Sequence, residues 1–533
     1  MYLKPFLASA AGLALCAGSA FADYRLNIIH INDLHSRIEP INRFDSTCNA
    51  EDDAEGKCFG GVARVATKIN ELRDGLRAAG ENVIVLDAGD QFQGSLMYTT
   101  YKGAVEAEFM EAIGFDAMAV GNHEFDDGPA GLADFLDRVS FPVISGNIDT
   151  SANNMLAGRV GGAMIMEVGG EKIGIVSALA TDTAETSSPG ETIVFEDEIA
   201  SLRAQVAAVQ AEGANKIIAL THVGLNRDLE IAAAVSGLDA IVGGHSHTYL
   251  SASNPKRHGA YPTWANGPDG NLVPVVQAYA YSKYVGHFEL EFDDDGNLVF
   301  AGGDTILLDS SVTPDAAISA RVAELAGPIE ELKAKVVASA ADVIDGSRDN
   351  CRAQECPMGN LVADAMLDRV KSQGVTIAIQ NGGGLRASID AGEVTMGEVL
   401  TVLPFQNTLS TFEVTGATIL AALENGVSRI EDGAGRFPQV AGMKYTLDKS
   451  AAPGGRISNV MVAEGDGFVA IDPAKTYAVV SNNYVRNGGD GYKMFRGAEN
   501  AYDYGPGLEE VVATYLAKGG EYAPYVDGRI SVK

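Results

Sequence analysis

The chain has 533 residues, which is too long for a single hydrophobic core and predicts two or three domains. Its hydrophobic fraction of 46% and charged fraction of 21% are those of an ordinary globular protein. With 39 basic and 71 acidic residues the net charge is −32, which disfavours binding to nucleic-acid polymers and to anionic membranes.

Residues 1–22 have the pattern of a secretory signal peptide. Lys4 provides a positive start, residues 7–17 are apolar, and the small-x-small sequence before Asp23 suits cleavage. A lipoprotein signal with Cys16 as the lipid-bearing residue is the alternative, but Leu15 is bulky where a small residue is preferred. No later stretch has the apolar length of a membrane span, and the end of the sequence has no hydrophobic anchor. We therefore expect a periplasmic or secreted protein.

Four cysteines remain after such a cleavage, and they form two near pairs. The pairs are Cys48 with Cys58 and Cys351 with Cys356. An oxidising compartment favours a disulfide within each pair, and each short loop so closed would contribute about 2–3 kcal/mol. Free thiols or a four-cysteine zinc site are the alternatives, although neither spacing is the CxxC that zinc prefers.

Residues 24–310 alternate apolar runs with amphipathic stretches, which predicts an α/β domain. Buried strands are expected at 26–32, 82–88, 115–121, 141–147, 172–178, 215–221 and 238–244. Helical periodicity is present at 62–76, 105–113 and 198–210. The long alternating stretch 273–297 ends in an Asp-Gly turn and predicts antiparallel strands, so the sheets of this domain should be mixed.

Residues 311–336 predict a helical linker that starts at Thr313-Pro314, and Pro328 should kink or break it. Residues 337–533 predict a second α/β domain. Its clearest strands are expected at 376–383 and 476–484, and its clearest helices at 359–370 and 416–427.

Seven metal-competent side chains occur at five places in the first half of the chain, and each place follows an apolar run. They are Asp33, His35, Asp90, Asn122, His222, His245 and His247. Loops at the carboxyl ends of strands in an α/β sheet meet at one edge, so these residues can converge. Carboxylate, amide and imidazole groups can hold two divalent cations about 3.5–4 Å apart, as in two-metal phosphatases. The pattern therefore predicts a phosphoester hydrolase.

Each of these signals has a structural alternative when it is taken alone. An aspartate after a strand commonly caps a turn, and His222 could be a hydrogen-bonded core histidine, as we expect for His30. The glycine-preceded pair His245 and His247 is a stronger signal, because it presents two nitrogen ligands on a closely approaching backbone. Taken together, five of the eight histidines follow apolar runs, which favours the metal interpretation: 35, 123, 222, 245 and 247.

The motifs that contain these residues resemble those of the calcineurin-like metallophosphoesterases, in the same order. They are DLHSR (33–37), GGVAR (60–64), LDAGDQFQG (86–94), GNHEFD (121–126), the lone His222 and GGHSH (243–247). More narrowly, the chain resembles the 5′-nucleotidase family, which includes animal ecto-enzymes and bacterial periplasmic enzymes. The resemblance extends from about Leu26 to the end, so it includes the second domain. It implies an N-terminal metallophosphoesterase sandwich followed by a nucleotide-binding domain.

The resemblance implies a role for each metal-competent residue. One cation would be held by Asp33, His35 and His247, and the other by Asn122, His222 and His245, with Asp90 bridging them. Because Asn or Gln also occurs at the position of His247 in the family, the contribution of His247 is open. Nitrogen-rich ligation favours Zn²⁺ or Mn²⁺ over Mg²⁺. A water held between two cations loses a proton near neutral pH and becomes the attacking hydroxide.

The resemblance also implies two catalytic residues and a set of substrate contacts. His123 would stabilise the transferring phosphoryl group and Asp126 would orient His123, which agrees with the electrostatics of such a pair. Arg352 and Arg386 would contact the phosphate, Asn381 the base or ribose, and Asp490 the ribose hydroxyls. Phe405 and Tyr484 match the positions that sandwich the base, a contact worth about 1–3 kcal/mol. Tyr484 replaces an expected phenylalanine, and Phe405 on local sequence alone would be a core residue.

We therefore expect an exported enzyme that hydrolyses nucleoside 5′-monophosphates such as AMP to nucleoside and phosphate. UDP-sugar hydrolysis and 2′,3′-cyclic-nucleotide phosphodiesterase or 3′-nucleotidase activity at the same site are the alternatives. A non-catalytic nucleotide-binding surface protein is a further one. The metals and the base contacts lie on different domains, so turnover should need the domains to meet, with a hinge near residues 330–340. The partners expected are small nucleotides, and the protein should be a monomer or a homodimer.

Overall fold

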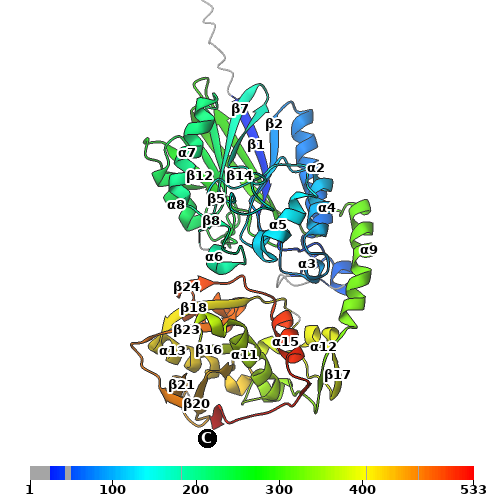
Figure 1. The fold of residues 1–533 in the computed structure, drawn as a ribbon, viewed down its shortest axis with the longest axis vertical. Coiled ribbons are helices and arrows are strands. Elements are labelled where there is room, and N and C mark those ends of the chain that lie inside the picture. Colours follow the sequence, from blue (N-terminus) through cyan, green and yellow to red (C-terminus); the bar gives the residue numbers. More distant parts are fainter. Residues whose placement is uncertain (1–23, 43–47, 49, 182, 404, 466) are drawn as a thin grey trace, which may run out of the picture.

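The structure is a computed structural model that describes residues 24–533 except 43–47, 49, 182, 404 and 466. The predicted signal peptide and its cleavage site lie outside the described residues. The described chain forms two α/β domains, and helix α9 (Ala316–Lys333) runs along the side of the molecule between them (Figure 1). Within that part of the chain, no helix combines the length and apolar character needed to cross a membrane.

The first domain is built on two mixed sheets of six strands each. The first has the order β14-β13-β1-β2-β3-β4, and its strands are β1 (Tyr24–Ile31), β2 (Asn82–Asp87), β3 (Ala117–Ala119), β4 (Val143–Ile144), β13 (Tyr284–Phe292) and β14 (Leu298–Leu307). The second has the order β11-β12-β10-β9-β7-β6, and its strands are β6 (Ala163–Val168), β7 (Glu171–Leu179), β9 (Lys216–His222), β10 (Ala240–Val242), β11 (Thr263–Asn266) and β12 (Leu272–Val276).

The two sheets pack face to face, and helices cover their outer faces, so the predicted α/β sandwich with mixed sheets is confirmed. Leu26 and Ile28 of β1 share a buried cluster with Ile175 of β7 and Leu220 of β9. The outer face of the first sheet packs against α2 (Val62–Ala78), α4 (Ala104–Ile113) and α5 (Gly128–Leu136). The outer face of the second packs against α7 (Glu198–Ala211) and α8 (Leu225–Ala234). Shorter elements complete the domain: α1 (Ala50–Ala54), α3 (Leu96–Tyr101), α6 (Thr183–Thr186), η1 (His123–Phe125), β5 (Ile148–Asp149) and β8 (Val194–Phe195).

The alternating stretch 273–297 contains one antiparallel hairpin and one strand of a different kind. Strands β13 and β14 pair antiparallel around the predicted turn, and β13 also pairs antiparallel with β1. Strand β12 instead pairs parallel with β10 and antiparallel only with β11. Val273, Val275 and Val276 are all buried, which is typical of a strand covered on both faces.

The second domain contains a central mixed sheet of five strands, in the order β19-β16-β23-β18-β24. These strands are β16 (Ile377–Asn381), β18 (Leu409–Thr415), β19 (Pro438–Ala441), β23 (Thr476–Asn482) and β24 (Glu499–Tyr502). Two smaller sheets flank it, formed by β15 (Val336–Ala340), β17 (Gly392–Thr395) and β25 (Glu521–Tyr522), and by β20 (Met443–Leu447), β21 (Ile457–Glu464), β22 (Gly467–Ala470) and β26 (Ile530–Val532). The helices are α10 (Arg348–Cys351), α11 (Pro357–Val370), α12 (Met396–Val402), α13 (Gly416–Val427), α14 (Asn483–Arg486) and α15 (Leu508–Ala517).

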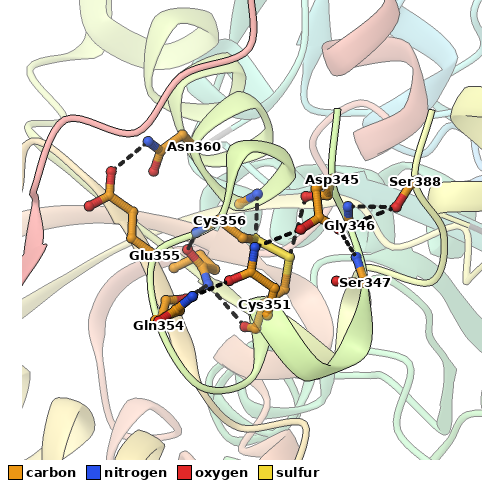
Figure 2. The surroundings of a disulfide bond; sticks show 12 residues. Asp345, Gly346, Ser347, Cys351, Gln354, Glu355, Cys356, Asn360 and Ser388 are labelled. Carbon is orange, nitrogen blue, oxygen red and sulfur yellow. Dashed lines mark hydrogen bonds between the residues drawn. A yellow bond between two sulfur atoms is a disulfide. The ribbon is translucent and has the colours of Figure 1, made fainter. Parts of the chain in front are cut away.

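Both predicted disulfides are present. The Cα atoms are 5.8 Å apart in Cys48–Cys58 and 5.1 Å apart in Cys351–Cys356. The second disulfide is fully buried and lies at the start of α11, where the sulfur of Cys356 accepts a hydrogen bond from the Gly359 amide. Figure 2 shows how it closes a short loop beside the segment that contains Asp345.

Candidate active site

The seven predicted metal-competent residues lie together where five parallel strands of the first domain end. Asp33 and His35 follow β1, Asp90 follows β2, and Asn122 follows β3. His222 is the last residue of β9, and His245 and His247 follow β10. The sheet packing therefore brings residues that are more than two hundred positions apart in sequence to one point.

Five of these seven residues have a left-handed backbone conformation. Their φ angles are 52° at Asp33, 49° at His35, 59° at Asp90, 75° at His245 and 48° at His247. Such conformations cost about 1–3 kcal/mol each in residues other than glycine, and they concentrate at functional sites where the surrounding fold holds them.

One group of side chains contains Asp33, His35 and His247. The Nε2 atoms of His35 and His247 are 2.9 Å apart, and His247 Nε2 is 3.2 Å from Asp33 Oδ1. The Nδ1 atom of His35 is 3.2 Å from the carbonyl oxygens of Phe92 and Gln93, so the ring proton belongs on Nδ1. The Nε2 lone pair of His35 therefore points into the group.

A second group contains Asn122, His222 and His245, and Asp90 lies between the two groups. His245 Nδ1 is 2.9 Å from Asn122 Oδ1, and His222 Nε2 is 3.0 Å from Asp90 Oδ2. The same Asp90 oxygen is 3.7 Å from His35 Nε2 in the first group. His222 Nδ1 lies 2.6 Å from the Ala88 carbonyl, which again leaves Nε2 directed at the centre.

The electrostatics of these groups fit a site for cations. Burial, reinforced by neighbouring histidines, lowers the pKa of both His35 and His245 to about 3, so both rings are neutral and able to bind a metal. Burial opposes a charge on His222 as well, but Asp90 and Asp33 outweigh it and raise the pKa of His222 to about 10. The buried carboxylates therefore stabilise positive charge at this point, which a divalent cation supplies.

His123 and Asp126 form a close pair beside the same centre. His123 Nδ1 is 2.7 Å from Asp126 Oδ2, and the His123 amide donates to Asp90 Oδ1 at 2.9 Å. Burial disfavours the imidazolium, but Asp126 and Asp90 outweigh it and raise the pKa of His123 to about 9. His123 Nε2 is buried and has no hydrogen-bond partner among the described residues. A ring so held can donate to an anionic group that enters the site.

Glu124 has a structural role, as its place beside the predicted catalytic pair led us to expect. Its carboxylate accepts the amides of Asp90 at 3.0 Å, Gln91 at 2.8 Å and Gly121 at 2.6 Å. It thereby joins the loop after β2 to the turn after β3. A Cβ on Gly121 would lie 2.2 Å from Asp90 Oδ1, so this turn requires glycine. The only available signal was the position of Glu124 within the GNHEFD motif.

Three of the six predicted substrate contacts meet directly in the second domain. Asn381, at the end of β16, donates to Asp490 Oδ2 at 2.8 Å, and the Tyr484 hydroxyl donates to Asp490 Oδ1 at 3.1 Å. Tyr484 is 47% exposed, so its ring is available to a ligand. These three residues form a polar cluster with an open aromatic face.

The other three lie on loops around the glycines that follow Asn381. Arg386 donates to the Gly383 carbonyl at 3.4 Å, and its guanidinium lies 5.5 Å from the centre of the Phe405 ring. Arg352 is 7% exposed and lies inside the disulfide loop, where it donates to the Gly433 carbonyl at 3.2 Å. All six predicted contacts are thus on the second domain.

A second-domain residue that the sequence did not identify lies against the metal-competent histidines. The Tyr504 ring centre is 4.7 Å from that of His247, 5.6 Å from that of His245 and 5.8 Å from that of His123. Tyr504 follows β24, which lies on the side of the second domain that faces the first (Figure 1). It belongs to none of the motifs, and only the packing of the two domains reveals it.

A cavity of about 710 Å³ lies between the domains beside these residues. Gln93, Asp126 and Ser187 line it from the first domain, and Arg369 and Tyr504 line it from the second. It gives a small polar molecule access to the vicinity of the His123–Asp126 pair.

Comparison with known proteins places each half of the chain in a described family. Residues 26–249 match the profile of the calcineurin-like phosphoesterases, and residues 334–497 match that of the 5′-nucleotidase C-terminal domain. Human 5′-nucleotidase is 39% identical over 95% of this chain and 91% of its own length. The snake venom 5′-nucleotidase of Naja atra is 37% identical over 95% of this chain and 98% of its own.

Several solved structures cover nearly the whole chain, and nucleotidases are among them. The 5′-nucleotidase precursor of Thermus thermophilus is 40% identical, covers 96% of this chain and 99% of its own, and has a TM-score of 0.61. The NAD nucleotidase of Haemophilus influenzae is 28% identical with the same coverage, and its TM-score is 0.80.

Proposed function

Because the chain belongs to the 5′-nucleotidase family, we propose that it hydrolyses nucleoside 5′-monophosphates such as AMP to a nucleoside and phosphate. Membership makes it a metal-dependent phosphoric monoester hydrolase. The proposal that nucleoside 5′-monophosphates are the substrates rests on the presence of two different sites in one chain. One is a carboxylate, amide and imidazole cluster next to His123, and the other is a polar, aromatic cluster around Asp490.

We propose that the first cluster binds two divalent cations. Asp33, His35 and His247 would hold one, Asn122, His222 and His245 the other, and Asp90 both. The distances within each group and the buried Asp90 carboxylate between the groups support this assignment. The nitrogen-rich set favours Zn²⁺, with Mn²⁺ as the alternative. When bound, two such cations lower the pKa of water and neutralise charge on a phosphate ester.

His123 and Asp126 are the proposed catalytic pair. Asp126 keeps the His123 ring charged and fixes its orientation through the Nδ1 contact of 2.7 Å. His123 Nε2 is then free to donate to a phosphoryl oxygen as negative charge develops there, which lowers the barrier. Gln93 and Ser187 support this geometry, because both donate to Asp126, at 3.2 Å and 2.7 Å.

The second cluster is the proposed nucleotide-binding site. Asp490 would accept the ribose hydroxyls, Asn381 would contact the base or ribose, and Arg352 and Arg386 would contact the phosphate. Phe405 and Tyr484 would stack on the base. The joint position of all six around the end of β16 and its glycine loop supports this assignment.

Turnover then requires the domains to rearrange, since Tyr504 lies over the metal-competent histidines in the arrangement described here. The comparisons support such mobility, because the structure with the higher identity has the lower TM-score although both cover 96% of the chain. We place the hinge near 330–340, where α9 ends at Lys333 and β15 begins at Val336.

We also propose that the protein is exported. The amino-terminal pattern, the two disulfides and the venom origin of several relatives support this assignment. The domain limits proposed are 1–22 for the signal peptide, 24–310 and 337–533 for the two domains, and 311–336 for the linker. Both a monomer and a homodimer fit this proposal.

A substrate with a pyrophosphate link is the second candidate. The relative with a TM-score of 0.80 is described as an NAD nucleotidase, and hydrolysis of a UDP-sugar would present the same kind of phosphorus centre. Cyclic 2′,3′-nucleotides are a further alternative at the same metal cluster.

The test is product analysis by chromatography after incubation with AMP, GMP, UMP, UDP-glucose, NAD and 2′,3′-cyclic AMP, each with and without a chelator. Only the monophosphates give inorganic phosphate in one step, whereas UDP-glucose and NAD give two monophosphates each and the cyclic nucleotide gives one. We expect the highest kcat/KM with a 5′-monophosphate and no hydrolysis after chelation. A higher kcat/KM with a cyclic nucleotide or a pyrophosphate would make that compound the substrate. Tight binding without hydrolysis would make the protein a nucleotide carrier.

A further inference from the structure

One buried amide side chain attaches the disulfide loop of residues 351–356 to the central sheet of the second domain. The Gln439 side chain donates from Nε2 to the carbonyls of Cys351 at 2.9 Å and Gln354 at 2.7 Å. Its Oε1 accepts the Cys356 amide at 3.3 Å. Gln439 therefore forms hydrogen bonds with both ends and with the middle of the loop, whose course is shown in Figure 2.

Gln439 itself is held rigidly. It is fully buried on β19, where it is the register partner of Gln380 on β16, and the next pair in that register joins Pro438 to Asn381. The Gln439 side chain therefore links the loop that contains Arg352 to the strand pair that contains Asn381. Glu355, in the same loop, accepts the amides of Asp527 and Ile530 and so links the loop separately to the region of β26.

The atoms around this contact are closely packed. A Cβ on Gly359 would lie 2.4 Å from Gln439 Cδ, and a Cβ on Gly382 would lie 2.4 Å from the Cys351 carbonyl oxygen. The disulfide alone does not fix this arrangement, because it joins the two ends of the loop to each other and not to β19. The hydrogen bonds of Gln439 make that second attachment.

We propose that Gln439 is a positioning residue that holds Arg352 at the correct distance from Asn381 and Asp490. Substrate phosphate and ribose would then be contacted at the same time. This inference rests on the proposed role of Arg352 as a phosphate contact. Gln439 is too deeply buried to touch the substrate, so it acts only through the loop.

The test compares inhibition constants of two ligands with the metal-loaded enzyme. One is a non-hydrolysable phosphonate analogue of AMP, and the other is adenosine, which has no phosphate. Gln439→Met keeps the length of the side chain and removes all three hydrogen bonds. We expect the inhibition constant of the phosphonate to rise roughly tenfold, as for loss of a charge-assisted hydrogen bond, while that of adenosine is unchanged. The KM for AMP should rise with it.

A second variant reaches the same contact without altering Gln439. Gly359→Ala would displace the Gln439 amide, since Gln439 supplies the nearest atoms to the added methyl group. Gly75→Ala, in α2, is the control, because nothing lies within 4 Å of its added methyl group. Gly359→Ala should raise the inhibition constant of the phosphonate and leave that of adenosine unchanged. Gly75→Ala should change neither inhibition constant.

Arg352→Ala separates this inference from the function on which it rests. If Gln439 acts through Arg352, Gln439→Met adds nothing to the effect of Arg352→Ala in the double variant. The positioning role would be overturned if the two substitutions had additive effects on the inhibition constant of the phosphonate. It would also be overturned if Gln439→Met raised the inhibition constants of adenosine and the phosphonate equally. Either result would leave the role of Arg352 intact. An Arg352→Ala enzyme with unchanged phosphonate inhibition would instead overturn the phosphate contact itself, and the role of Gln439 with it.

Discussion

Asp126 is approached by three side chains from different parts of the first domain. His123, Gln93 and Ser187 lie 2.7, 3.2 and 2.7 Å from its carboxylate oxygens. The adjacent Asp127 faces another way, where it accepts the hydroxyl of Tyr98 at 2.8 Å. Two neighbouring carboxylates in one turn therefore have separate partners, and this difference allows a matched test of the first.

We predict that Asp126→Asn lowers kcat for AMP by about 10²-fold, because the imidazolium of His123 loses its charged partner while its ring keeps a similar neighbour. Asp127→Asn is the control and should stay within about twofold of the wild type, since Asp127 contacts neither His123 nor the metal-competent residues in the hydrogen bonds described above. Steady-state kinetics on both variants measure the difference. Equal losses in the two would argue against the catalytic pairing.

At the residue scale, the sequence predicted that the metal-competent residues after the apolar runs would lie close together. Asp33 and Asp90 were visible because a strand end is a local pattern, and its convergence with other strand ends is a rule of α/β sheets. Tyr504 and Gln439 were not visible, since their neighbours are brought to them only by domain packing and strand register. His30 agrees with its expected structural role, because it is buried and its Nε2 is 2.8 Å from the Tyr261 hydroxyl.

Helix α9 contains Pro328, a residue that is unfavourable inside a helix, and packing against the first domain keeps the helix intact. It is continuous through the exposed Pro328, although the ring removes a hydrogen bond and costs about 3 kcal/mol. Leu325 and Ile329, on either side of the proline, are buried in the first-domain core. The Leu325 carbonyl also accepts the Tyr101 hydroxyl at 2.8 Å. The linker helix is therefore attached to the first domain along its length.

We predict that Ile329→Ala lowers the free energy of unfolding by about 2–4 kcal/mol, because a side chain that is 4% exposed leaves a cavity. Thermal unfolding of the purified protein measures the change. The exposed Glu331→Ala in the same helix is the control and should unfold like the wild type. If both variants unfolded at the same temperature, α9 would not be anchored as described.

We expect the stability of the protein to depend on pH through Asp239, the residue just before β10. Asp239 accepts the Ile217 amide at 2.7 Å, and burial raises its pKa from 3.8 to about 7, with that hydrogen bond and Lys216 offsetting only part of the effect. Folding therefore takes up a proton here. The contribution of Asp239 to stability is complete below about pH 4 and is lost as the pH rises through about 7.

Asp239→Asn keeps the acceptor oxygen and does not titrate. We predict that its melting temperature, relative to that of the wild type, increases steadily from pH 5 to about pH 8. The exposed Asp295→Asn is the control and should show a constant difference. A constant difference for Asp239→Asn as well would contradict the assigned titration.

At the element scale, the sequence predicted most strands of the first domain, because parallel strands covered on both faces form continuous apolar runs. It did not distinguish β12 from the hairpin β13–β14. Both alternate in sequence, and only the neighbour of β12 in the sheet decides its direction. The near-sequence disulfide pairs were predictable, since each closes a loop whose ends are already close.

On the scale of the whole molecule, the two proposed sites lie on separate domains joined at one short segment. Lys102 and Glu510 line the cavity between the domains from opposite sides. We predict that joining Lys102→Cys and Glu510→Cys with a short cleavable maleimide linker abolishes AMP turnover while the metal content is unchanged. The native cysteines do not compete, because four are in disulfides and Cys16 precedes the proposed cleavage site.

Cleavage of the linker should restore activity, and each single-cysteine variant carrying the reagent should remain active. Full turnover by the cross-linked enzyme would show that the arrangement described here is already competent. The expectation of domain motion rests on the resemblance alone, since no local pattern in a sequence encodes the relative placement of two domains. The position of Tyr504 adds a physical reason for it.

The most direct test of the central claim is metal analysis of purified wild-type protein and Asp90→Asn, coupled to phosphate release from AMP. Asp90 lies 3.0 Å from His222 and 3.7 Å from His35, so it should bind both cations. We predict about two divalent cations per wild-type chain, fewer in the variant, and kcat/KM lower by about 10³-fold in the variant. Chelation should abolish wild-type activity, and added Zn²⁺ or Mn²⁺ should restore it. Undiminished hydrolysis by Asp90→Asn, or by fully chelated wild-type protein, would contradict the account.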